Sequence, residues 1–580
     1  MGPHPPRAEA QEWVPASGPN LEARERPAPA DADRIYITDR IIAGNPSGFN
    51  HLEVVGRIKE IQLMLPMSRK IDYRVDDPLF MSLGQNTKEA LRSVAGPYYL
   101  CVGDQASVQK SILKMDFEPA SVFRNDPYWR IAVENIIDIY SRVWTWSTRC
   151  SSPEEVMATL NVDSSPGVPL TQAGFRHKAD VLDDPWGRSY LFMRGLFIVV
   201  WRLVDKHEWY HVTDLQNGKV RTFIIPPFKF LLLQKRLFYT QNESMKEFHW
   251  SAYGFNPYNG GVNRLVMRLK KNPIYFMYDV SGWDRLFPVM EEVYEIRLRF
   301  FSPEDLPLAQ WVAEKTRCSL ILLPDGTLIL KKIGNNSGSN NTTSDNILGH
   351  TLIQEYNLLK LFAGDEDLVD QCVVSLFGDD DVGSMPDIGL TDDEIKEHFI
   401  SVFSEFNFVL NPIVITRDIS QLEFLGFGFK CIDGFWYPQY KIDRLVAAFC
   451  YEIDKGMDTA AQISKAYSLM VMAWPTQHPV LEQMKAAYSH YCLVLRDSTD
   501  PIVRSYIDQG VPTDDEIDNF YTGRECSIVS DLFRMDLVVQ KGYTSKYGNE
   551  SRDTRRKAPE STGQQRSFNR EGKGLVDSRY

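Results

Sequence analysis

The chain has 580 residues, 43% of them hydrophobic and 24% charged, and this length is enough for several packed subdomains. No stretch reaches the apolar length of a membrane span, because the strongest candidate, residues 190–204, is interrupted by Arg194 and Arg202. The formal net charge of −13 excludes a basic surface over the whole molecule, although an enzyme can line an internal channel with cations.

Both ends of the chain have compositions typical of disorder. Residues 1–34 are rich in proline, alanine and charge without periodicity, and we expect them to be disordered. Residues 544–580 are similar but mildly basic. We expect a solvated tail there, with a contact to nucleic acid or a partner as the alternative.

The region between the ends mixes strand and helix patterns. Residues 273–279 ("PIYFMYD") form a short apolar run that predicts a buried strand ending on an aspartate. Residues 320–332 place two apolar runs around Pro-Asp-Gly and predict a β-hairpin. Apolar residues at helical spacing predict a helix over 342–362, which Ser344 or Asp345 can cap.

Two further patterns complete the predicted elements. Residues 373–382 ("VVSLFGDDDV") predict a strand, a tight turn and a second strand. Residues 441–540 contain successive amphipathic helical patterns and predict a separate helical subdomain. The chain is therefore expected to combine helix and strand first and to become mostly helical afterwards.

Three consecutive aspartates follow Gly378 in the predicted turn. Adjacent carboxylates repel one another, so we expect them to hold a positive charge. A second acidic segment, "YDVSGWDRLFP" (278–288), ends the predicted strand with Asp279, and Asp284 can fold back through the Ser-Gly turn between them. Magnesium ions held by carboxylates from different segments stabilise the attacking and leaving oxygens of phosphoryl transfer. The sequence therefore predicts a magnesium site built from these two segments.

A loop rich in glycine, asparagine and serine, "GNNSGSNNTTSDN" (334–346), lies between the two acidic segments. It contains the pattern SGxxxTxxxN, in which helical spacing puts Thr342 and Asn346 on one face. A hydroxyl and an amide there can recognise a ribose 2′-hydroxyl, which both donates and accepts a hydrogen bond. For this segment in isolation, an ordinary N-capped loop is the alternative.

In this order and spacing, the three segments resemble motifs A, B and C of viral RNA-dependent RNA polymerases of the picornavirus-like supergroup. The loop sequence and the proline after motif A are similar to astrovirus-like polymerases, and "DVSGWD" is similar to sobemovirus-like enzymes. Three flanking segments extend the resemblance: "SSPGVP" (164–169) to motif G, "GKVRTFIIPP" (218–227) to motif F and "LEFLGFGF" (422–429) to motif E. Six motifs in the expected order make coincidence a poor explanation.

The resemblance implies that Asp279 and Asp379 are the principal ligands of Mg²⁺, for which Mn²⁺ can substitute. Asp380 is expected to be a weaker ligand, and the three aspartates are expected to form the catalytic set. Asp381 departs from the usual family residue. Strand alternation points it away from the metals, so we expect a solvated or packing variant there.

The resemblance also implies that Asp284, Ser337, Thr342 and Asn346 bind the incoming nucleotide. Asp284 with Asn346 would recognise the ribose 2′-hydroxyl, with Ser337 nearby. A reverse transcriptase tends to carry a bulky residue at the position of Asp284, so an aspartate there favours RNA synthesis.

Two basic residues of motif F, Lys219 and Arg221, would neutralise the triphosphate, although an ordinary surface strand is the alternative. Motif D departs from the family pattern, because its lysine aligns with Ile415 and the nearest cation is Arg417. Arginine stays charged and is a poor proton donor, but Arg417 could contact the leaving group.

Motif G and the flexible loop imply contacts to the template. The expected template-binding residues are Ser164, Ser165, Gly167 and Gly338. The implied partners are an RNA template and primer, nucleoside triphosphates, a protein primer and other viral replication proteins. The implied location is the cytoplasm of a host cell, at viral replication complexes.

The fold class implied by the resemblance is α+β, a right hand with fingers, a palm on an antiparallel sheet and a helical thumb. The expected boundaries are 1–34 disordered, 35–272 fingers, 273–440 palm with a finger insertion near 300–333, 441–543 thumb and 544–580 tail.

Two other functions stay open. One is a reverse transcriptase-like palm polymerase, against which Asp284 and Asn346 count. The other is a non-catalytic RNA-binding protein on a degenerate polymerase fold, against which the intact Asp279 and Asp379 count.

Overall fold

Helices and strands alternate along the part of the chain that the computed structural model describes, which is residues 26–42, 49–58, 75–100, 104–144, 150–206, 208–218, 221–248, 250–452 and 457–524. Within these ranges, no helix combines the length and apolar character needed to cross a membrane. Residues 1–25, Lys219 and the predicted tail at 544–580 lie outside the described residues.

The described strands lie in four sheets. The six-stranded sheet has the order β1 (Ile41–Ile42), β2 (Glu53–Ile58), β9 (Thr327–Lys331), β8 (Ser319–Leu322), β4 (Val200–Asp205) and β6 (Thr222–Ile225). The four-stranded sheet has the order β10 (Val373–Phe377), β11 (Asp380–Met385), β7 (Ile274–Val280) and β12 (Leu410–Thr416). The smaller sheets contain β13 (Glu423–Phe424), β14 (Phe427–Ile432) and β15 (Phe435–Tyr440), and β3 (Tyr98–Leu100) with β5 (Trp209–His211).

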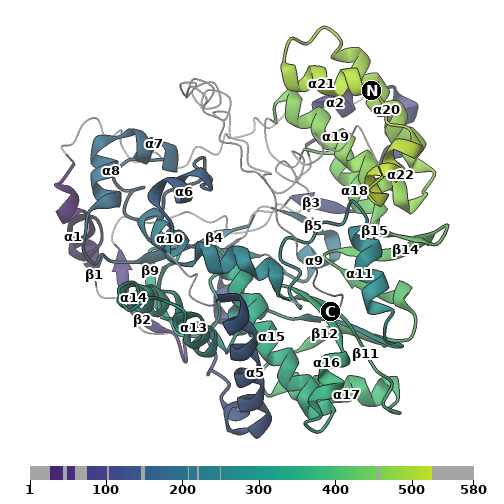
Figure 1. Ribbon diagram of the computed structural model, residues 1–580. Helices are drawn as coiled ribbons and strands as arrows, with labels where there is room; N and C mark the ends of the chain where they lie inside the picture. Colours follow the sequence, from purple (N-terminus) through teal and green to yellow (C-terminus); the bar gives the residue numbers. More distant parts are fainter. Residues whose placement is uncertain are drawn as a thin grey trace, which may run out of the picture.

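The helices surround these sheets (Figure 1). Those before the four-stranded sheet are α1 (Ala32–Tyr36), α2 (Pro78–Met81), α3 (Gln85–Val94), α4 (Gln105–Leu113), α5 (Pro127–Trp144), α6 (Pro153–Ala158), α7 (Lys178–Asp183), α8 (Pro185–Phe192), α9 (Val212–Gln216), α10 (Phe228–Ser244) and α11 (Gly261–Leu269). Those that follow are α12 (Trp283–Leu286), α13 (Met290–Leu298), α14 (Leu306–Arg317), α15 (Thr342–Leu361), α16 (Glu366–Gln371), α17 (Asp392–Ser404), α18 (Ile442–Cys450), α19 (Thr459–Ala473), α20 (Val480–Val494), α21 (Pro501–Gln509) and α22 (Asp514–Thr522).

The predicted strand, hairpin, helix and acidic turn are all confirmed as β7, β8–β9, α15 and β10–β11. The predicted cap of α15 is wrong. The N-cap residue is Asn341, without a side-chain capping bond, and Asp345 lies inside the helix. Asp345 is fully buried and pairs with an arginine from another helix, as described below.

The four-stranded sheet is covered on both faces, and strand alternation divides its side chains between two cores. From β7, Phe276 and Tyr278 pack with α15 and α17. Tyr275 and Met277 point the other way and pack with α11 and the three-stranded sheet. Figure 1 shows β11 and β12 between these layers. The ends of the strands are therefore held by packing from two sides.

The hairpin β8–β9 joins the six-stranded sheet, far from its sequence neighbours in the four-stranded sheet. β9 pairs with β2 and β8 runs parallel to β4, so the hairpin lies among strands from residues 41–58 and 200–225. This is the region that the sequence assigns to an insertion near 300–333. Because these strands pair with β2 and β4, the insertion packs with the N-terminal part of the chain and not with the four-stranded sheet on either side of it in the sequence.

The C-terminal helices include a segment from the N-terminal part of the chain. Phe80 and Leu91, from α2 and α3, share one core with α18, α19, α20 and α22. The buried Lys465 ammonium donates to Oδ2 of Asp77 at 2.7 Å, and both side chains are nearly inaccessible to water. Figure 1 shows α2 beside α19 and α20. The single unit predicted for residues 35–272 is therefore wrong at this segment, because local pattern carries no information on such a distant partner.

The predicted disordered segment also extends too far. Residues 29–36 form a 3₁₀ turn and α1, and Arg26 donates to the Asp184 carboxylate at 2.8 Å. The Arg26 guanidinium also lies 4.3 Å from the centre of the Phe175 ring. Residues 26–34 are thus held by contacts to α8 and its neighbourhood.

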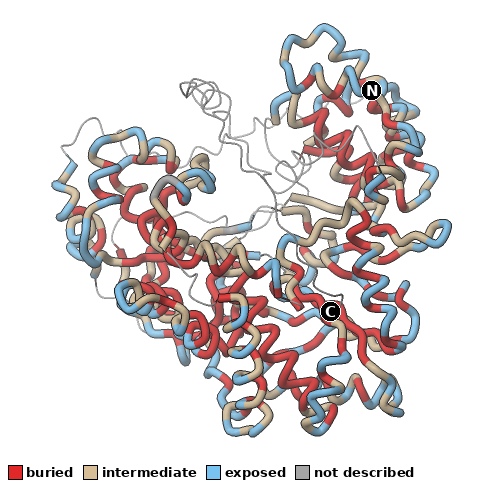
Figure 2. The backbone as a smooth tube through the Cα atoms, viewed as in Figure 1, coloured by how far each residue is buried: buried red, intermediate tan, exposed pale blue. Residues whose placement is uncertain are grey.

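Helix α15 is buried along most of its length, and Figure 2 shows the buried core around it. Every residue from Ser344 to Leu359 is buried. Its first turn carries Asp345, whose carboxylate forms an ion pair with Arg297 of α13. The exposed fractions of the two side chains are 1% for Arg297 and 0% for Asp345.

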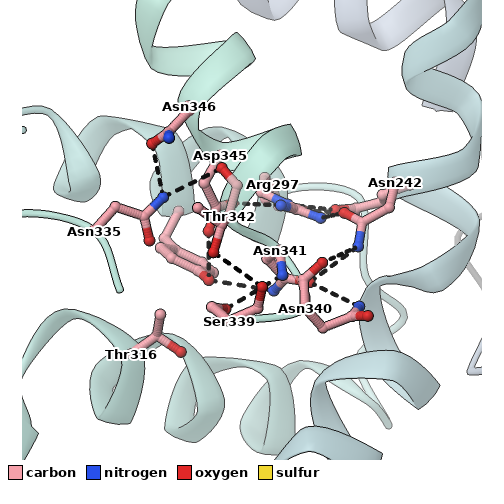
Figure 3. Close-up of polar contacts among 12 residues, drawn as sticks. Asn242, Arg297, Thr316, Asn335, Ser339, Asn340, Asn341, Thr342, Asp345 and Asn346 are labelled. Atoms are coloured by element: carbon pink, nitrogen blue, oxygen red, sulfur yellow. Dashed lines mark hydrogen bonds and ion pairs between the residues drawn. The ribbon is translucent and has the colours of Figure 1, made fainter. Parts of the chain in front are cut away.

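Hydrogen bonds from two helices complete this buried ion pair (Figure 3). Arg297 donates through Nε to Gln241 Oε1 at 3.0 Å and through Nη2 to Asn242 Oδ1 at 2.6 Å. The Tyr294 hydroxyl donates to Oδ2 of Asp345 at 3.0 Å. A buried charge pair is tolerated when its remaining donors and acceptors are satisfied, and this pair joins α10, α13 and α15.

We expect removal of Arg297 to loosen the start of α15. In Arg297→Met, the Asp345 carboxylate loses its partner in a site that water cannot reach. The free energy of local unfolding should fall by about 3–5 kcal/mol. Hydrogen exchange of the α15 amides would measure this change.

Arg299→Met is the matched control, because Arg299 makes an exposed ion pair with Glu295 at 2.8 Å. It should change the same exchange by at most about 1 kcal/mol. Equal protection of α15 in both variants would contradict the assigned role of the buried pair.

Candidate active site

Aspartates from two strands meet at one end of the four-stranded sheet. β11 and β7 pair antiparallel, with Gly383 opposite Phe276. Continuing this register places Asp380 opposite Asp279. Asp379 precedes Asp380 in the turn that joins β10 to β11. The two acidic segments predicted from the sequence are therefore neighbours in space.

These carboxylates destabilise one another's charge. Desolvation by the surrounding protein, together with the charges of Asp284, Asp380 and Asp279, raises the pKa of Asp379 to about 7. Burial and the charge of Asp279 raise the pKa of Asp380 to about 6, against a smaller opposing effect from Arg221. Asp379 and Asp380 are nevertheless exposed to solvent at the end of the sheet, so a ligand can reach them. Among the described residues, the nearby positive charge does not balance these carboxylates.

The donor set fits a divalent metal that prefers oxygen. Among the described residues, no three His, Cys, Asp or Glu side chains form a group that could hold a metal by themselves. Magnesium does not need such a cage, because it keeps several waters and binds through one or two carboxylates plus substrate phosphates. Asp279, Asp379 and Asp380 offer this kind of partial, solvent-accessible carboxylate site.

Asp381 is a packing residue and not a solvated one. Its side chain is 3% exposed, and its Oδ1 accepts a hydrogen bond from the backbone nitrogen of Tyr278 at 2.9 Å. Burial raises the pKa of Asp381 well above its usual range. The side chain therefore tightens the contact between β11 and β7 beside the acidic turn.

The predicted nucleotide-binding pair is joined by a direct hydrogen bond. Asn346 Nδ2 donates to Asp284 Oδ1 at 2.8 Å, and Asn335 Nδ2 donates to Asn346 Oδ1 at 2.9 Å. The Asn335 backbone also donates to the carbonyl of Asp284 at 2.8 Å. Burial raises the pKa of Asp284, opposed by the bond from Asn346. The three side chains form a fixed polar network next to the acidic turn.

The other two predicted nucleotide-binding side chains hold the loop itself. The Thr342 hydroxyl lies 2.6 Å from the carbonyl of Asn336 and 2.9 Å from that of Ser339, and it closes the loop onto α15. Ser337 Oγ accepts a hydrogen bond from the backbone nitrogen of Ile224 at 3.4 Å. These contacts position the loop relative to β6.

Three predicted motifs meet at β6, which belongs to motif F and is approached by Gly338 of motif B and Gly167 of motif G. Gly338 donates to the carbonyl of Ile224 at 2.9 Å, and a Cβ on Gly338 would lie 2.6 Å from that oxygen. Gly167 packs against the residues after β6, where a Cβ would lie 3.1 Å from Cα of Pro227. Only glycine permits both approaches without displacement of the backbone.

The predicted template-binding serines make hydrogen bonds inside their own loop. Ser164 Oγ donates to the carbonyl of Asn161 at 3.0 Å and accepts from Lys178. Ser165 Oγ accepts from the backbone nitrogen of Gly167 at 3.4 Å. Burial, together with the charge of Lys235, lowers the pKa of Lys178 to about 8.

Arg221 lies within electrostatic range of the acidic turn, since its charge lowers the pKa of Asp380. The side chain is 59% exposed, and its Nε lies 3.5 Å from Glu208. An exposed ion pair of this kind is weak, so the Arg221 guanidinium can leave Glu208 and bind another anion. Lys219, its predicted companion, lies outside the described residues.

Arg417 lies at the wrong end of the sheet for its predicted role. β12 runs antiparallel to β7, with Leu410 opposite Val280 and Thr416 opposite Tyr275. Arg417 is thus about 17 Å along the strand from Asp279. There it pairs with Asp387 at 3.4 Å and also with Asp392. This position contradicts the prediction of a leaving-group contact at Arg417.

Comparisons with known proteins agree with this geometry. A family model described as viral RNA-dependent RNA polymerase matches residues 142–491, which contain both acidic segments and the loop between them. The chain belongs to the viral RNA-dependent RNA polymerase family. Within it, the nearer resemblance to astrovirus-like or sobemovirus-like enzymes stays a prediction.

Several genome polyproteins of plant viruses are relatives of this polymerase-family chain. It is 26% identical to that of tobacco vein mottling virus over 335 residues, 55% of this chain and 11% of the polyprotein. It is 27% identical to that of sweet potato mild mottle virus (isolate Salazar) over 290 residues, 48% of this chain and 8% of the polyprotein. It is 26% identical to that of plum pox potyvirus (strain SK 68) over 361 residues, 58% of this chain and 11% of the polyprotein. The chain thus spans about a tenth of each relative.

Two buried residues of this polymerase-family site were not predicted from the sequence. Arg285 Nη2 donates to the carbonyl of Thr222 at 2.6 Å and so ties the turn after Asp284 to β6. His350 lies between Tyr278 and Gly378, at 2.8 and 3.1 Å, and burial lowers its pKa to about 4. Their spacing from predicted residues could have indicated them, because Arg285 is next to Asp284 and His350 is four positions, about one helical turn, after Asn346.

The repulsion among the carboxylates predicts a pH-dependent stability. Because the pKa of Asp379 is raised to about 7, the folded state binds its proton more tightly than the unfolded chain does. The metal-free protein should therefore lose stability as pH rises from about 4 to 7. Relative to the parent, the melting temperature of Asp379→Asn should rise by about 1–2 °C across this range.

Addition of Mg²⁺ at pH 7.5 should raise the melting temperature of the parent more than that of Asp379→Asn. Asp387→Asn is the control, because Asp387 lies at the opposite end of the sheet, next to Arg417. A pH profile of Asp379→Asn parallel to that of the parent would contradict the assigned repulsion.

Proposed function

We propose that this chain is an RNA-directed RNA polymerase that extends an RNA 3′ end with nucleoside triphosphates on an RNA template. One observation carries the proposal. The acidic ends of β7 and β11 lie beside the hydrogen-bonded pair Asp284–Asn346, so carboxylates for a metal and a polar network for a ribose share one site. Membership of the viral polymerase family supports the same reaction.

Asp279 and Asp379 would hold divalent metal, with Asp380 as the weaker ligand. When bound, two such ions supply charge stabilisation to the attacking and leaving oxygens of phosphoryl transfer. The protein holds its carboxylates ready on paired strands, so little rearrangement is needed when the ions arrive. Arg221 is exposed and near Asp380, and we assign it to the triphosphate.

Asp284 and Asn346 are assigned to the ribose of the incoming nucleotide. Asn346 Nδ2 is already bonded to Asp284 Oδ1, which leaves Oδ2 of Asp284 as an acceptor for a 2′-hydroxyl. Asn335 Nδ2 donates to Oδ1 of Asn346 and so orients the Asn346 amide. A deoxyribose cannot donate to this acceptor, so the network would favour ribonucleotides.

The architecture supports assignment to a right-hand fold with revised boundaries. The four-stranded sheet with α15 and α17 is the palm, and the six-stranded sheet, including β8 and β9, belongs to the fingers. The thumb consists of α18–α22 together with α2 and α3, because these helices share one core. Figure 1 shows α6, α7 and α8 at the upper left and α18–α22 at the upper right, with the four-stranded sheet below α18–α22.

The template is assigned to the region where residues 164–169 and Gly338 meet β6. Both segments approach the backbone of β6 closely, so a strand of RNA laid across them would be placed with little freedom. Lys178 contributes positive charge beside Ser164. A protein primer and other replication proteins are proposed as further partners, since the relatives are genome polyproteins.

The decisive experiment is incorporation of labelled ribonucleotides on a homopolymer RNA, with and without a primer. We expect incorporation that requires Mg²⁺ or Mn²⁺. Asp379→Ala should lower the rate by at least about 100-fold, because metal stabilisation is worth several kcal/mol.

Arg417→Met is the control for this assay, because Arg417 lies at the far end of the sheet and should leave the rate within about twofold. Full activity in Asp379→Ala would refute the site. Absence of incorporation under every initiation condition would favour the non-catalytic RNA-binding alternative.

Loss of the ribose network should change substrate choice. Asn346→Ala removes the donor that orients Asp284, so the preference for a ribonucleotide over a deoxyribonucleotide should fall about 10- to 100-fold. The ratio of kcat/KM values for the two nucleotides measures the effect.

Asn357→Ala is the matched control on the same helix, because neither side-chain amide atom of Asn357 has a hydrogen-bond partner. It should leave the preference unchanged. A parent chain that prefers deoxyribonucleotides would instead support the reverse transcriptase alternative.

A further inference from the structure

The imidazole of His350 connects three segments that the sequence resemblance treats separately. His350 lies on α15, and its Nε2 is 2.8 Å from the hydroxyl of Tyr278 on β7. Its Nδ1 is 3.1 Å from the carbonyl oxygen of Gly378, which begins the acidic turn. Tyr278 directly precedes Asp279, and Gly378 directly precedes Asp379. The ring therefore contacts the residue before each of the two principal proposed metal ligands.

The chemistry of these groups gives the hydrogen bonds a direction. A carbonyl oxygen can only accept, so Nδ1 of His350 must carry the hydrogen that meets Gly378. The ring is fully buried and neutral, so Nε2 has no hydrogen and accepts from the Tyr278 hydroxyl. The Tyr278 hydroxyl also lies 2.7 Å from Oε1 of Gln354, so two acceptors face the same hydroxyl. Hydrogen bonds thus run from Tyr278 through His350 to the turn.

The turn has little other support on this side. Gly378 has a φ of +70°, and no atom lies within 4 Å of the place where a Cβ would be. Asp379 and Asp380, which follow, are exposed and repel one another. A bond from a buried side chain to the carbonyl at the start of the turn would limit how far repulsion can push the two carboxylates apart.

The His350 ring is itself held in place. Its centre lies 4.5 Å from that of Trp283, the residue before Asp284, and Trp283 stacks on Phe408 at 5.0 Å. Asn346, His350 and Gln354 follow one another at intervals of four residues, so they line one face of α15. The three side chains of this face contact Asp284, Gly378 and Tyr278 respectively.

We propose that His350 is a positioning residue that sets the distance between the acidic turn and Asp279 through the chain Tyr278–His350–Gly378. The proposal rests on the proposed function, since it concerns the same carboxylates. It makes a separate claim, namely that a neutral side chain that touches no substrate tunes the affinity of the site for divalent metal.

Two variants test the chain. His350→Phe keeps an aromatic ring but removes both hydrogen bonds of the imidazole, and Tyr278→Phe removes the hydroxyl that contacts His350 and Gln354. Each should weaken Mn²⁺ binding to the full chain about two- to tenfold, measured from the signal of free Mn²⁺ by electron paramagnetic resonance. The Mg²⁺ concentration for half-maximal incorporation should rise by the same factor, and the rate at saturating Mg²⁺ should return to within about twofold of the parent.

The controls remove comparable bonds elsewhere. His398→Phe deletes a contact from a half-buried histidine to the carbonyl of Asn357 at 3.2 Å. Tyr521→Phe deletes a bond from a buried hydroxyl to the carbonyl of Val471 at 3.2 Å. Neither should change Mn²⁺ affinity.

Unchanged Mn²⁺ affinity in both test variants, with a native circular dichroism spectrum, would overturn the proposal. Equal weakening in the controls would overturn it too, because it would indicate general loosening. If His350→Phe does not fold, Tyr278→Phe decides alone. A parent that binds Mn²⁺ but incorporates nothing would refute the proposed function, while the titration would still decide the role of His350.

Discussion

The antiparallel pairing of β7 with β11 is the constraint on which the site depends. It brings Asp279 and the turn at Asp379 together although their mutual repulsion opposes this. The opposition is overcome elsewhere, because one face of the sheet packs against α15 and α17 and the other against α11 and the three-stranded sheet. Burial of apolar area on two faces is worth far more than a few unfavourable carboxylate contacts. The packing holds the carboxylates in a geometry that they would not adopt alone.

Helix α15 extends this constraint to the pair Asp284–Asn346, which is the proposed ribose contact. Its beginning is fixed by the buried ion pair between Asp345 and Arg297, and one face presents Asn346, His350 and Gln354 to the acidic end. The loop before it is fixed on β6 through Gly338. The same helix therefore orients the ribose network, the acidic turn and the region assigned to the template, and a shift of α15 would disturb all three together.

Much of this arrangement could be predicted from the sequence, because local patterns determine it. The strand ending on Asp279, the acidic turn and the helix after the glycine-rich loop each have a period or a turn signal. The errors all concern distant partners. Asp345 reads as a helix cap, but its partner Arg297 lies 48 positions earlier. Arg417 follows the right strand, but only the register of β12 shows that it is at the far end. Nothing local joins Asp77 to Lys465, which lies 388 positions away.

The choice of neighbours around the acidic turn explains how the site keeps its charge. An arginine or lysine paired directly with Asp379 would lower the pKa of that carboxyl and stabilise the protein, but it would also occupy the oxygens that a metal needs. The side chains that touch this end of the sheet are mostly neutral: Asn346, Asn335, His350 and Tyr278. Among the described residues, the nearby cations have other contacts, since Arg221 lies near Glu208, Arg285 is bonded to Thr222 and Lys331 to Gly334. Neutral donors fix the position of the backbone and side chains without cancelling the negative field. The protein thus separates orientation from neutralisation, and under the proposed function a divalent ion would supply the neutralisation.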